Sequence, residues 1–472
     1  MNELTALAKQ FPDDFIFGVA TSSYQIEGAT KEDGRGASIW DAFCNMPGRV
    51  YKGHNGDVAC DHYHLWEQDL DLIQALGVDA YRFSLAWPRI IPNGVGAVNP
   101  AGLDFYDRLV DGMLERGLQV FPTLYHWDLP LNLAGYGGWT DRDTAEAFAH
   151  YASVVMQRLG DRFDTVTTFN EPWCACHLSH LLGIHAPGEK NMVATLRSIH
   201  NMNLAHGLAV QAIRAERADI PVGIVLNAMS ISPASETKAD VDAAERRFQF
   251  DNGVFFGPIF NGAYDKEFSE ELGEHLPIET GDLEIINQPL DFWGFNYYTP
   301  VKVTDAKTQS SIFPHTKNVT ASPRNDRTDI GWEIGAFGLS QLLTQVYKRY
   351  DLPPVYITEN GACYNTEVGD DGKVHDVERT NYFNEHISEC AKVVEAGIDM
   401  RGYFAWSLMD NFEWAEGYKM RFGLVHVDFD TQVRTIKDSG YWYSELAQAH
   451  RSEADANDTS GNSVEADSDY EP

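Results

Sequence analysis

The chain has 472 residues, with 36 Lys and Arg against 70 Asp and Glu, which gives a formal net charge of −34 at pH 7. A surface this acidic repels phosphodiester backbones and anionic headgroups, so the composition argues against nucleic-acid and membrane-surface partners. Because 43% of the residues are hydrophobic and 12% are aromatic, the chain can bury a large core and is not a disordered polyanion.

The first ten residues lack a basic region followed by an apolar stretch, and no run of about 18 apolar residues occurs later in the chain. We therefore predict neither a signal peptide nor a transmembrane helix. The six cysteines are widely scattered, which favours reduced thiols and a cytoplasmic location.

Short runs of β-branched and aromatic residues alternate along the chain with longer segments of helical periodicity. In chain order, the predicted strands and the helices that follow them are 15–22 and 61–76, 80–86 and 100–116, 119–125 and 141–159, 165–169 and 192–215, 222–227 and 240–250, 292–297 and 335–349, 355–358 and 377–396, and 402–407 and 439–450. Eight strand–helix units in succession predict an α/β fold, a single (β/α)8 TIM barrel with elaborated loops between strands and helices.

The pattern predicts one catalytic barrel domain over residues 1–450. Residues 451–472 carry seven acidic residues and one Arg with little to bury, which predicts a disordered acidic tail.

Amides, carboxylates and tryptophans collect where the predicted strands end, and this rim is where the active sites of α/β barrels form. The residues are Gln25, Arg82, His126, Asn170, Glu171, Asn227, Asn296, Tyr298, Glu359, Trp406, Glu413 and Trp414. Packing does not account for so many polar groups at one rim.

Glu171 and Glu359 each close an apolar strand, and each has an Asn as a neighbour. We expect strands four and seven to face each other across the barrel, so that both carboxylates point into one cleft. Hydrolysis of a glycosidic bond needs such a pair, one carboxylic acid to protonate the leaving oxygen and one carboxylate to attack or to activate water. A single Glu at a strand end is more often a solvated surface residue, but two in the same setting favour catalysis.

Around this pair, Gln25, His126, Asn170 and Glu413 offer donors and acceptors for vicinal hydroxyls, and Trp406 and Trp414 offer flat faces for a sugar ring. The competing interpretations are a buried core histidine at position 126, plain packing for Trp127 and an ordinary ion pair for Arg82.

Metal sites and other nucleophiles have weaker support. His62 and His64 are two residues apart and do not share a helix face. Cys174, Cys176 and His177 lack the partner pair that a four-ligand zinc site requires. Neither a Gly-x-Ser-x-Gly elbow nor a Gly-rich phosphate loop is present, so we predict no metal and no cofactor.

Seven ordered motifs resemble the β-glucosidases of glycoside hydrolase family 1, and the likeness covers roughly residues 12–444. The motifs are FGVATSSYQIEG (17–28), RFSLAWPRI (82–90), TLYHWDLP (123–130), TFNEPW (168–173), GFNYY (294–298), ITENG (357–361) and WSLMDNFEWAEGY (406–418). The resemblance implies a (β/α)8 barrel, a general acid/base at Glu171 and a nucleophile at Glu359.

The resemblance also implies roles for the residues around the two glutamates. The sugar would be held by Gln25, His126, Trp127, Asn170, Glu413 and Trp414, with Trp406 beneath it and with Phe422 as a further substrate-binding residue. Glu359 would be oriented and kept ionised by Arg82, Asn296 and Tyr298. The leaving group would lie at a mouth lined by Trp173, Asn227 and Trp332.

Two positions narrow the choice within the family. The acid/base position holds Glu171 rather than the Gln of thioglucosidases, and the Glu413–Trp414 pair, which phospho-glycosidases replace, is intact. The expected activity is that of a retaining β-glucosidase that removes terminal β-D-glucosyl residues, and also galactosyl or fucosyl residues, from cello-oligosaccharides and aryl or alkyl glucosides, as in cellulose degradation. A transglycosylase and a non-catalytic carbohydrate-binding barrel remain as alternatives, the expected partner is a small carbohydrate, and the oligomeric state is left open.

Overall fold

The computed structural model describes residues 3–307, 313–320 and 326–461. Within these residues, eight parallel strands close into a barrel in the neighbour order β1-β11-β10-β7-β5-β4-β3-β2. The strands are β1 (Ile16–Ala20), β2 (Ala80–Ser84), β3 (Gln119–Tyr125), β4 (Val166–Asn170), β5 (Val222–Leu226), β7 (Trp293–Asn296), β10 (Val355–Asn360) and β11 (Met400–Trp406). All eight predicted strands are present, and the predicted barrel is confirmed.

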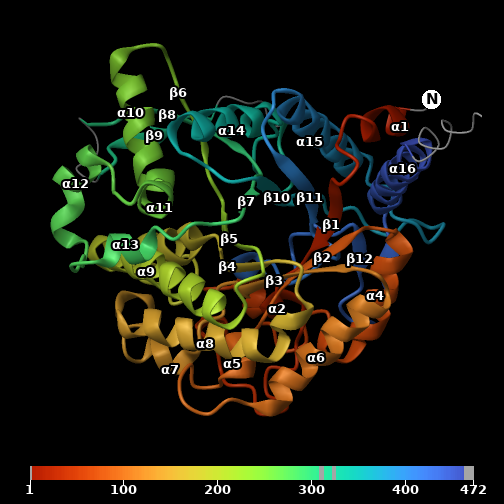
Figure 1. Cartoon of the computed structure of the whole chain (residues 1–472), viewed down its shortest axis with the longest axis horizontal. Coiled ribbons are helices and arrows are strands. Elements are labelled where there is room, and N and C mark those ends of the chain that lie inside the picture. Colours follow the sequence, from red (N-terminus) through yellow and green to blue (C-terminus); the bar gives the residue numbers. More distant parts are fainter. Residues whose placement is uncertain (1–2, 308–312, 321–325, 462–472) are drawn as a thin grey trace, which may run out of the picture.

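Long helices cover the outside of the barrel, as Figure 1 shows. They are α4 (His62–Leu76), α6 (Pro100–Glu115), α8 (Asp143–Leu159), α9 (Met192–Glu216), α10 (Lys238–Phe248), α14 (Phe337–Arg349), α15 (Val377–Glu395) and α16 (Asp438–Gly461). Helix α6 illustrates the sequence pattern, because Pro100 occupies its first turn and its buried residues recur at three- and four-residue spacing. In the part of the chain that is described, no helix combines the length and the apolar character that crossing a bilayer requires.

The loops between strands and helices carry further elements, most of which are too short for sequence periodicity to reveal. A three-stranded sheet contains β6 (Ser230–Pro233), β8 (Pro300–Asp305) and β9 (Thr316–Asn318), and a hairpin contains β12 (Val425–Val427) and β13 (Arg434–Ile436). The short helices are α1 (Glu3–Ala8), α2 (Ser23–Ile26), α3 (Ile39–Cys44), α5 (Trp87–Ile90), α7 (Leu131–Ala134), α11 (Val254–Phe256), α12 (Lys266–Leu272) and α13 (Asp282–Ile286), with π-helical segments η4 (Cys174–Leu181), η5 (Gln249–Gly253) and η6 (Gly257–Asn261) and 3-10 turns η1 (Tyr51–Gly53), η2 (Gly138–Thr140), η3 (Gly160–Arg162), η7 (Gly273–His275) and η9 (Trp414–Glu416).

Strands four and seven of the barrel, β4 and β10, do not face each other. Between them in the closed sheet lie β5 and β7, so that the strand opposite β4 is β11. The expectation of a direct opposition was therefore wrong, because closure with eight strands puts the fourth strand opposite the eighth. Both carboxyl ends still meet at one rim, since all eight strands are parallel.

Helix α16 continues to Gly461, beyond residue 450, where the sequence analysis placed the start of a disordered tail. Two contacts fix its extension: Arg451 lies 3.0 Å from Asp79, and Glu453 lies 2.9 Å from Lys9, which follows α1. Figure 1 shows α1 and α16 side by side. Residues 462–472 of the predicted tail lie outside the described residues.

Below the rim, aromatic side chains fill the barrel interior. The ring of Phe121 lies 5.0 Å from that of Phe404 and 5.7 Å from that of Tyr356. Gly18 makes room for this layer, because a Cβ there would lie 2.5 Å from the Phe404 ring. Trp406 and Phe422 belong to the same buried cluster, so the packed interior directly supports the rim above it.

Candidate active site

A cavity of about 520 Å3 opens at the carboxyl ends of the strands. Its volume is in the range that holds a small organic ligand. Of the predicted site residues, the cavity is lined by His126, Trp127, Glu171, Trp173, Asn227, Asn296, Tyr298, Trp332, Glu359, Trp406, Glu413, Trp414 and Phe422. The fold therefore brings to one place residues that are spread over nearly 300 positions of the chain.

Glu359 is the second-to-last residue of strand β10, and it pairs with Asn296 of the neighbouring strand β7. Its Oε1 accepts a hydrogen bond from the Arg82 guanidinium at 2.7 Å, and its Oε2 accepts one from the Tyr298 hydroxyl at 2.7 Å. Burial raises the pKa of Glu359 above its usual value, and the contacts with Arg82 and Tyr298 act against this rise. Both contacts favour the charged form of Glu359, as a nucleophile requires.

Glu171 follows the last residue of strand β4 and has a φ of 48°, a left-handed conformation that non-glycine residues adopt rarely. Its Oε1 accepts a hydrogen bond from Asn296 Nδ2 at 2.6 Å, and its Oε2 accepts one from Cys174 Sγ at 3.0 Å. Burial, followed by the charge of Glu359, raises the pKa of Glu171 to about 8. The acid form of Glu171 is therefore favoured at neutral pH.

A buried hydrogen-bond network links the two glutamates. Asn170 Oδ1 accepts hydrogen bonds from Arg82 at 2.7 Å and from Asn296 at 3.0 Å. Since Arg82 also binds Glu359 and Asn296 also binds Glu171, the positions of the two carboxyl groups depend on each other. Arg82 and Asn170 are at most 2% exposed, and they lie behind the cavity wall rather than in it.

Glu413 adds a third carboxyl group to the cavity. Burial, and then the charges of Glu359 and Glu171, raise its pKa to about 8. Gln25 is fully buried behind Glu413, where its Nε2 lies 3.5 Å from Glu413 Oε2 and donates to the Phe412 carbonyl at 2.9 Å. Gln25 thus supports the loop that carries Glu413, and its predicted contact with a sugar stays a prediction.

Indole and imidazole rings form the base of the cavity. The His126 ring lies 5.8 Å from Trp406 and 5.9 Å from Trp414 and is nearly parallel to both. Burial, together with the nearby Arg82, holds the pKa of His126 well below its usual value, so the imidazole is neutral. Its Nε2 lies 3.0 Å from Asn170 Nδ2, and its Nδ1 has no partner among the described residues. One ring nitrogen thus stays available to a ligand.

The mouth of the cavity is lined by aromatic residues and by residues that the sequence analysis did not select. Trp332 lies 5.8 Å from Phe422 and 5.3 Å from Tyr298. The additional lining residues include Cys174, His185, Met229 and Arg247. The spacing of three residues from Glu171 could have indicated Cys174, whereas nothing in the sequence connects Arg247 of α10 with this rim.

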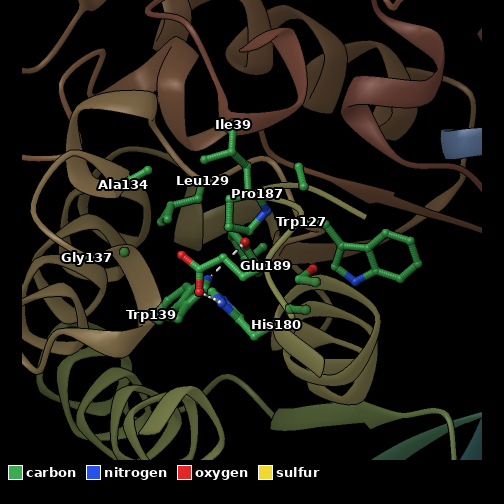
Figure 2. A pocket seen from close by; sticks show the side chains of 14 residues that line it. Ile39, Trp127, Leu129, Ala134, Gly137, Trp139, His180, Pro187 and Glu189 are labelled. Atoms are coloured by element: carbon green, nitrogen blue, oxygen red, sulfur yellow. Dashed lines mark hydrogen bonds and ion pairs between the residues drawn. The ribbon is translucent and has the colours of Figure 1, made fainter. Parts of the chain in front are cut away.

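A second cavity, of about 50 Å3, lies behind Trp127 (Figure 2). At its far side His180 Nδ1 and a carboxylate oxygen of Glu189 lie 2.9 Å apart. Trp127 lines both cavities and has a φ of 78°, and its Nε1 donates to the Asn170 carbonyl at 2.9 Å. Trp127 therefore belongs to the walls of both cavities.

The residues considered as zinc ligands point in different directions. Cys174 Sγ contacts Glu171, Cys176 Sγ lies 3.5 Å from the Met202 sulfur, and His177 Nε2 lies 3.2 Å from the Phe250 carbonyl. In the described part of the chain, no group of three or more His, Cys, Asp or Glu residues has the arrangement of a metal site.

Two buried carboxyl groups with different hydrogen-bond partners, at the rim of a (β/α)8 barrel and beside an aromatic-lined cavity, form the arrangement that glycoside hydrolases use. The sequence profile of glycosyl hydrolase family 1 matches residues 7–452, and the chain belongs to this family.

Known relatives cover nearly the whole chain. A β-glucosidase of Agrobacterium sp. (strain ATCC 21400) is 61% identical over 448 residues, which are 95% of this chain and 97% of that protein. A bifunctional β-D-glucosidase/β-D-fucosidase of Bifidobacterium breve is 45% identical, over 93% of this chain and 98% of that protein. The virulence factor SghA of Agrobacterium tumefaciens, solved in complex with its substrate analogue salicin, is 61% identical with a TM-score of 0.94 over 95% of this chain and 99% of that one.

Proposed function

We propose that the protein is a retaining β-glucosidase that acts through Glu359 as nucleophile and Glu171 as general acid/base. The observation that carries this assignment is the different environment of the two carboxyl groups. Glu359 contacts a guanidinium and a phenol that favour its charge. Glu171, whose pKa burial and the charge of Glu359 raise to about 8, accepts hydrogen bonds only from an amide and a thiol in the described structure.

In the first step, Glu359 attacks the anomeric carbon and forms a covalent glycosyl ester. The bond to the leaving oxygen breaks as Glu171 transfers its proton to that oxygen. Arg82 and Tyr298 hold the attacking carboxylate in place with one hydrogen bond to each oxygen.

In the second step, Glu171 is ionised and takes a proton from a water molecule as the water attacks the anomeric carbon. The ester bond breaks, the sugar leaves with its original anomeric configuration, and Glu359 regains its charge. Glu171 gives one proton to the leaving group in the first step and takes one from water in the second, so it returns to its starting state without a cofactor.

The proposed substrates carry a terminal, non-reducing β-D-glucosyl residue, and also a galactosyl or fucosyl residue, on a cello-oligosaccharide or on an aryl or alkyl group. Glu413, His126 and Trp414 offer the sugar hydrogen bonds, and Trp406 offers it an apolar face. The mouth of the cavity offers the leaving group aromatic faces from Trp173, Trp332 and Phe422 and an amide from Asn227. The glucosidase and fucosidase names of the relatives support this range of substrates, and they favour hydrolysis over transglycosylation.

We further infer a reducing compartment, the cytoplasm, as the place where the enzyme works. Its six cysteines all lie in the described part of the chain as buried free thiols. Detection of the protein in a periplasmic or secreted fraction rather than in the cytosolic one would contradict this assignment.

Rescue by azide of alanine variants tests the two catalytic roles. With 2,4-dinitrophenyl β-glucoside and azide, Glu359→Ala should release the inverted α-glucosyl azide, since azide enters from the side that the nucleophile occupied. Glu171→Ala should release the retained β-glucosyl azide, because azide then attacks the glycosyl ester. The wild-type enzyme with azide is the control and should yield glucose. If Glu359→Ala gave the β-azide and Glu171→Ala the α-azide, the two roles would be reversed. Hydrolysis by both variants at the wild-type rate without azide would exclude both roles.

A further inference from the structure

Cys174 occupies the first position of the π-helical segment η4, one turn after Glu171. Its backbone N–H donates to the Glu171 carbonyl at 2.9 Å, so its side chain returns toward the Glu171 carboxyl group. The side chain is 5% exposed, and it lines the active-site cavity. Segments of π-helix occur often at functional sites, where they place one side chain where a regular helix would not.

The thiol of Cys174 has a defined orientation. Asn227 Nδ2 donates to Sγ at 3.5 Å, which leaves the thiol hydrogen directed at Glu171 Oε2, 3.0 Å away. Burial, followed by the charge of Glu171, holds the pKa of Cys174 well above its usual value. The group therefore remains a thiol at neutral pH and does not compete with Glu171 as a base.

The two oxygens of Glu171 have unequal partners. Oε1 accepts a short hydrogen bond of 2.6 Å from the Asn296 amide, which has no acceptor capacity at that nitrogen. A proton on Glu171 is thus favoured on Oε2, where the partner is a thiol that is both a weak donor and a weak acceptor. A weak partner stabilises either protonation state slightly and lets the proton leave toward a substrate oxygen.

We propose that Cys174 is a positioning residue of the acid/base, which holds Oε2, the oxygen that carries the transferable proton of Glu171, and makes Glu171 a stronger acid than it would be without the thiol. This inference rests on the proposed role of Glu171 in hydrolysis. It predicts that the thiol acts when the leaving group needs protonation, and that it contributes little when the leaving group departs unassisted.

Other charged and titratable groups around Glu171 are fixed by the rest of the barrel. They are Glu359 of β10, Arg82 of β2, neutral His126 after β3, Tyr298 after β7, Glu413 and Glu416 after β11, and at the mouth His185 and Arg247, the latter paired with Asp251. Among them, Glu359 raises the pKa of Glu171 and Arg82 lowers it, and the thiol of Cys174 also lowers it. Replacement of Cys174 leaves these groups in place, so a shift in the acid can be attributed to the thiol.

The experiment compares Cys174→Ala and Cys174→Ser with Cys176→Ala, which removes a buried thiol two residues away that contacts Met202 instead of Glu171. For each variant kcat/KM is measured against pH, with methyl β-glucoside as a substrate that needs protonation and 2,4-dinitrophenyl β-glucoside as one that does not. In Cys174→Ala the alkaline limb should move up by about half a pH unit, because an ionised Glu171 loses a donor. In Cys174→Ser the limb should stay or move down, since a hydroxyl is a stronger donor.

At the pH optimum, Cys174→Ala should lose about 3- to 10-fold in kcat/KM toward the methyl glucoside, a small part of what general acid catalysis supplies. It should change by less than about twofold toward the dinitrophenyl glucoside, and Cys176→Ala should leave both values unchanged. An alkaline limb shared by all variants would overturn the proposal, and so would an equal loss with both substrates, which would indicate a structural role. Failure of the proposed function is a separate result, visible as an inactive wild-type enzyme or as a fully active Glu171→Ala.

Discussion

Arg82 and Glu359 form an ion pair of 2.7 Å between side chains that are only 2% and 4% exposed. The second terminal nitrogen of the same guanidinium binds Asn170, which belongs to the network around Glu171. One cation therefore sets both the charge of the proposed nucleophile and the position of the acid/base.

Replacement of Arg82 by Met should reduce both activity and stability. It leaves the Glu359 charge buried without its partner, which costs about 3–5 kcal/mol in the free energy of unfolding when the charge is retained. We expect kcat/KM to fall by about 100-fold or more, because loss of a well-placed charged contact in an active site has effects of this size. Urea denaturation and steady-state kinetics measure the two effects. Arg401→Met is the control, since the exposed Arg401–Asp399 pair should contribute less than about 1 kcal/mol; similar losses in both variants would contradict the special role of Arg82.

The activity should follow a bell-shaped pH profile with its alkaline limb near pH 8. Glu171 must be protonated for the first step, and burial together with the charge of Glu359 raises its pKa to about 8. Activity is thus lost as the pH rises through this value. The profile of kcat/KM for a methyl or alkyl β-glucoside measures it, and full activity at pH 10 would be incompatible with Glu171 as the acid.

The same pKa shift affects stability. The folded state binds a proton on Glu171 more tightly than the unfolded chain, so the stability contribution of this group is fully present below the unfolded value of about 4.5 and is lost as the pH rises toward 8. Glu171→Gln removes this titration. Its Tm should therefore decline less than that of the wild type between pH 5 and pH 9 in thermal denaturation. Parallel declines would show that the carboxyl group does not titrate in this window.

Tyr298→Phe should weaken the nucleophile without disturbing the fold. The variant loses the hydroxyl that donates to Glu359 Oε2 at 2.7 Å, and the pKa of Glu359 should rise. We expect about a tenfold loss of kcat/KM and an acidic limb that moves to higher pH, since a hydrogen bond to a charged group contributes about 1.5–3 kcal/mol. Tyr347→Phe, which loses a hydroxyl bonded to the Pro353 carbonyl on the outside of the barrel, is the matched control. An unchanged acidic limb in Tyr298→Phe would exclude the role.

Asp410 should prove essential for the loop that carries Glu413. Its two oxygens accept hydrogen bonds from Lys437 at 2.7 Å and from Arg421 at 2.8 Å. The side chains of Asp410 and Lys437 are fully buried, and that of Arg421 is partly buried. Asp410→Ala leaves both cations without their partner, so we expect a loss of about 3–5 kcal/mol in the free energy of unfolding. Asp399→Ala, at the surface, should cost less than about 1 kcal/mol. Chemical denaturation of the two variants side by side measures the difference, and equal values would show that burial of the charges has no such effect.

The barrel could be predicted because each of its strands is an apolar run bounded by polar residues. The two glutamates stood out for the same reason, as carboxyl groups placed directly at the ends of such runs. Their relative positions could not be predicted well, because the neighbour order in a closed sheet depends on all eight strands. The small sheet of β6, β8 and β9 was missed because its strands are only partly buried and lack the apolar runs of the barrel strands.

The roles of individual side chains were harder to predict than their place at the rim. The sequence could not show that the amide of Gln25 donates to the Phe412 carbonyl behind Glu413, and its predicted contact with the substrate stays a prediction. Cys174 was considered together with Cys176 and His177 as a metal ligand, because their closeness in sequence concealed that they point to different neighbours. Arg247 reaches the cavity from α10, and such a contact between distant segments leaves no trace in a single sequence.

Trp127 has a consequence for the size of the sugars that the enzyme admits. It lines both the active-site cavity and the smaller cavity beside His180 and Glu189. We expect a smaller residue at position 127 to widen the active-site cavity without a change in any strand of the barrel. Trp127 is therefore a natural starting point for engineering an enzyme that cleaves glucosides with bulky ring substituents.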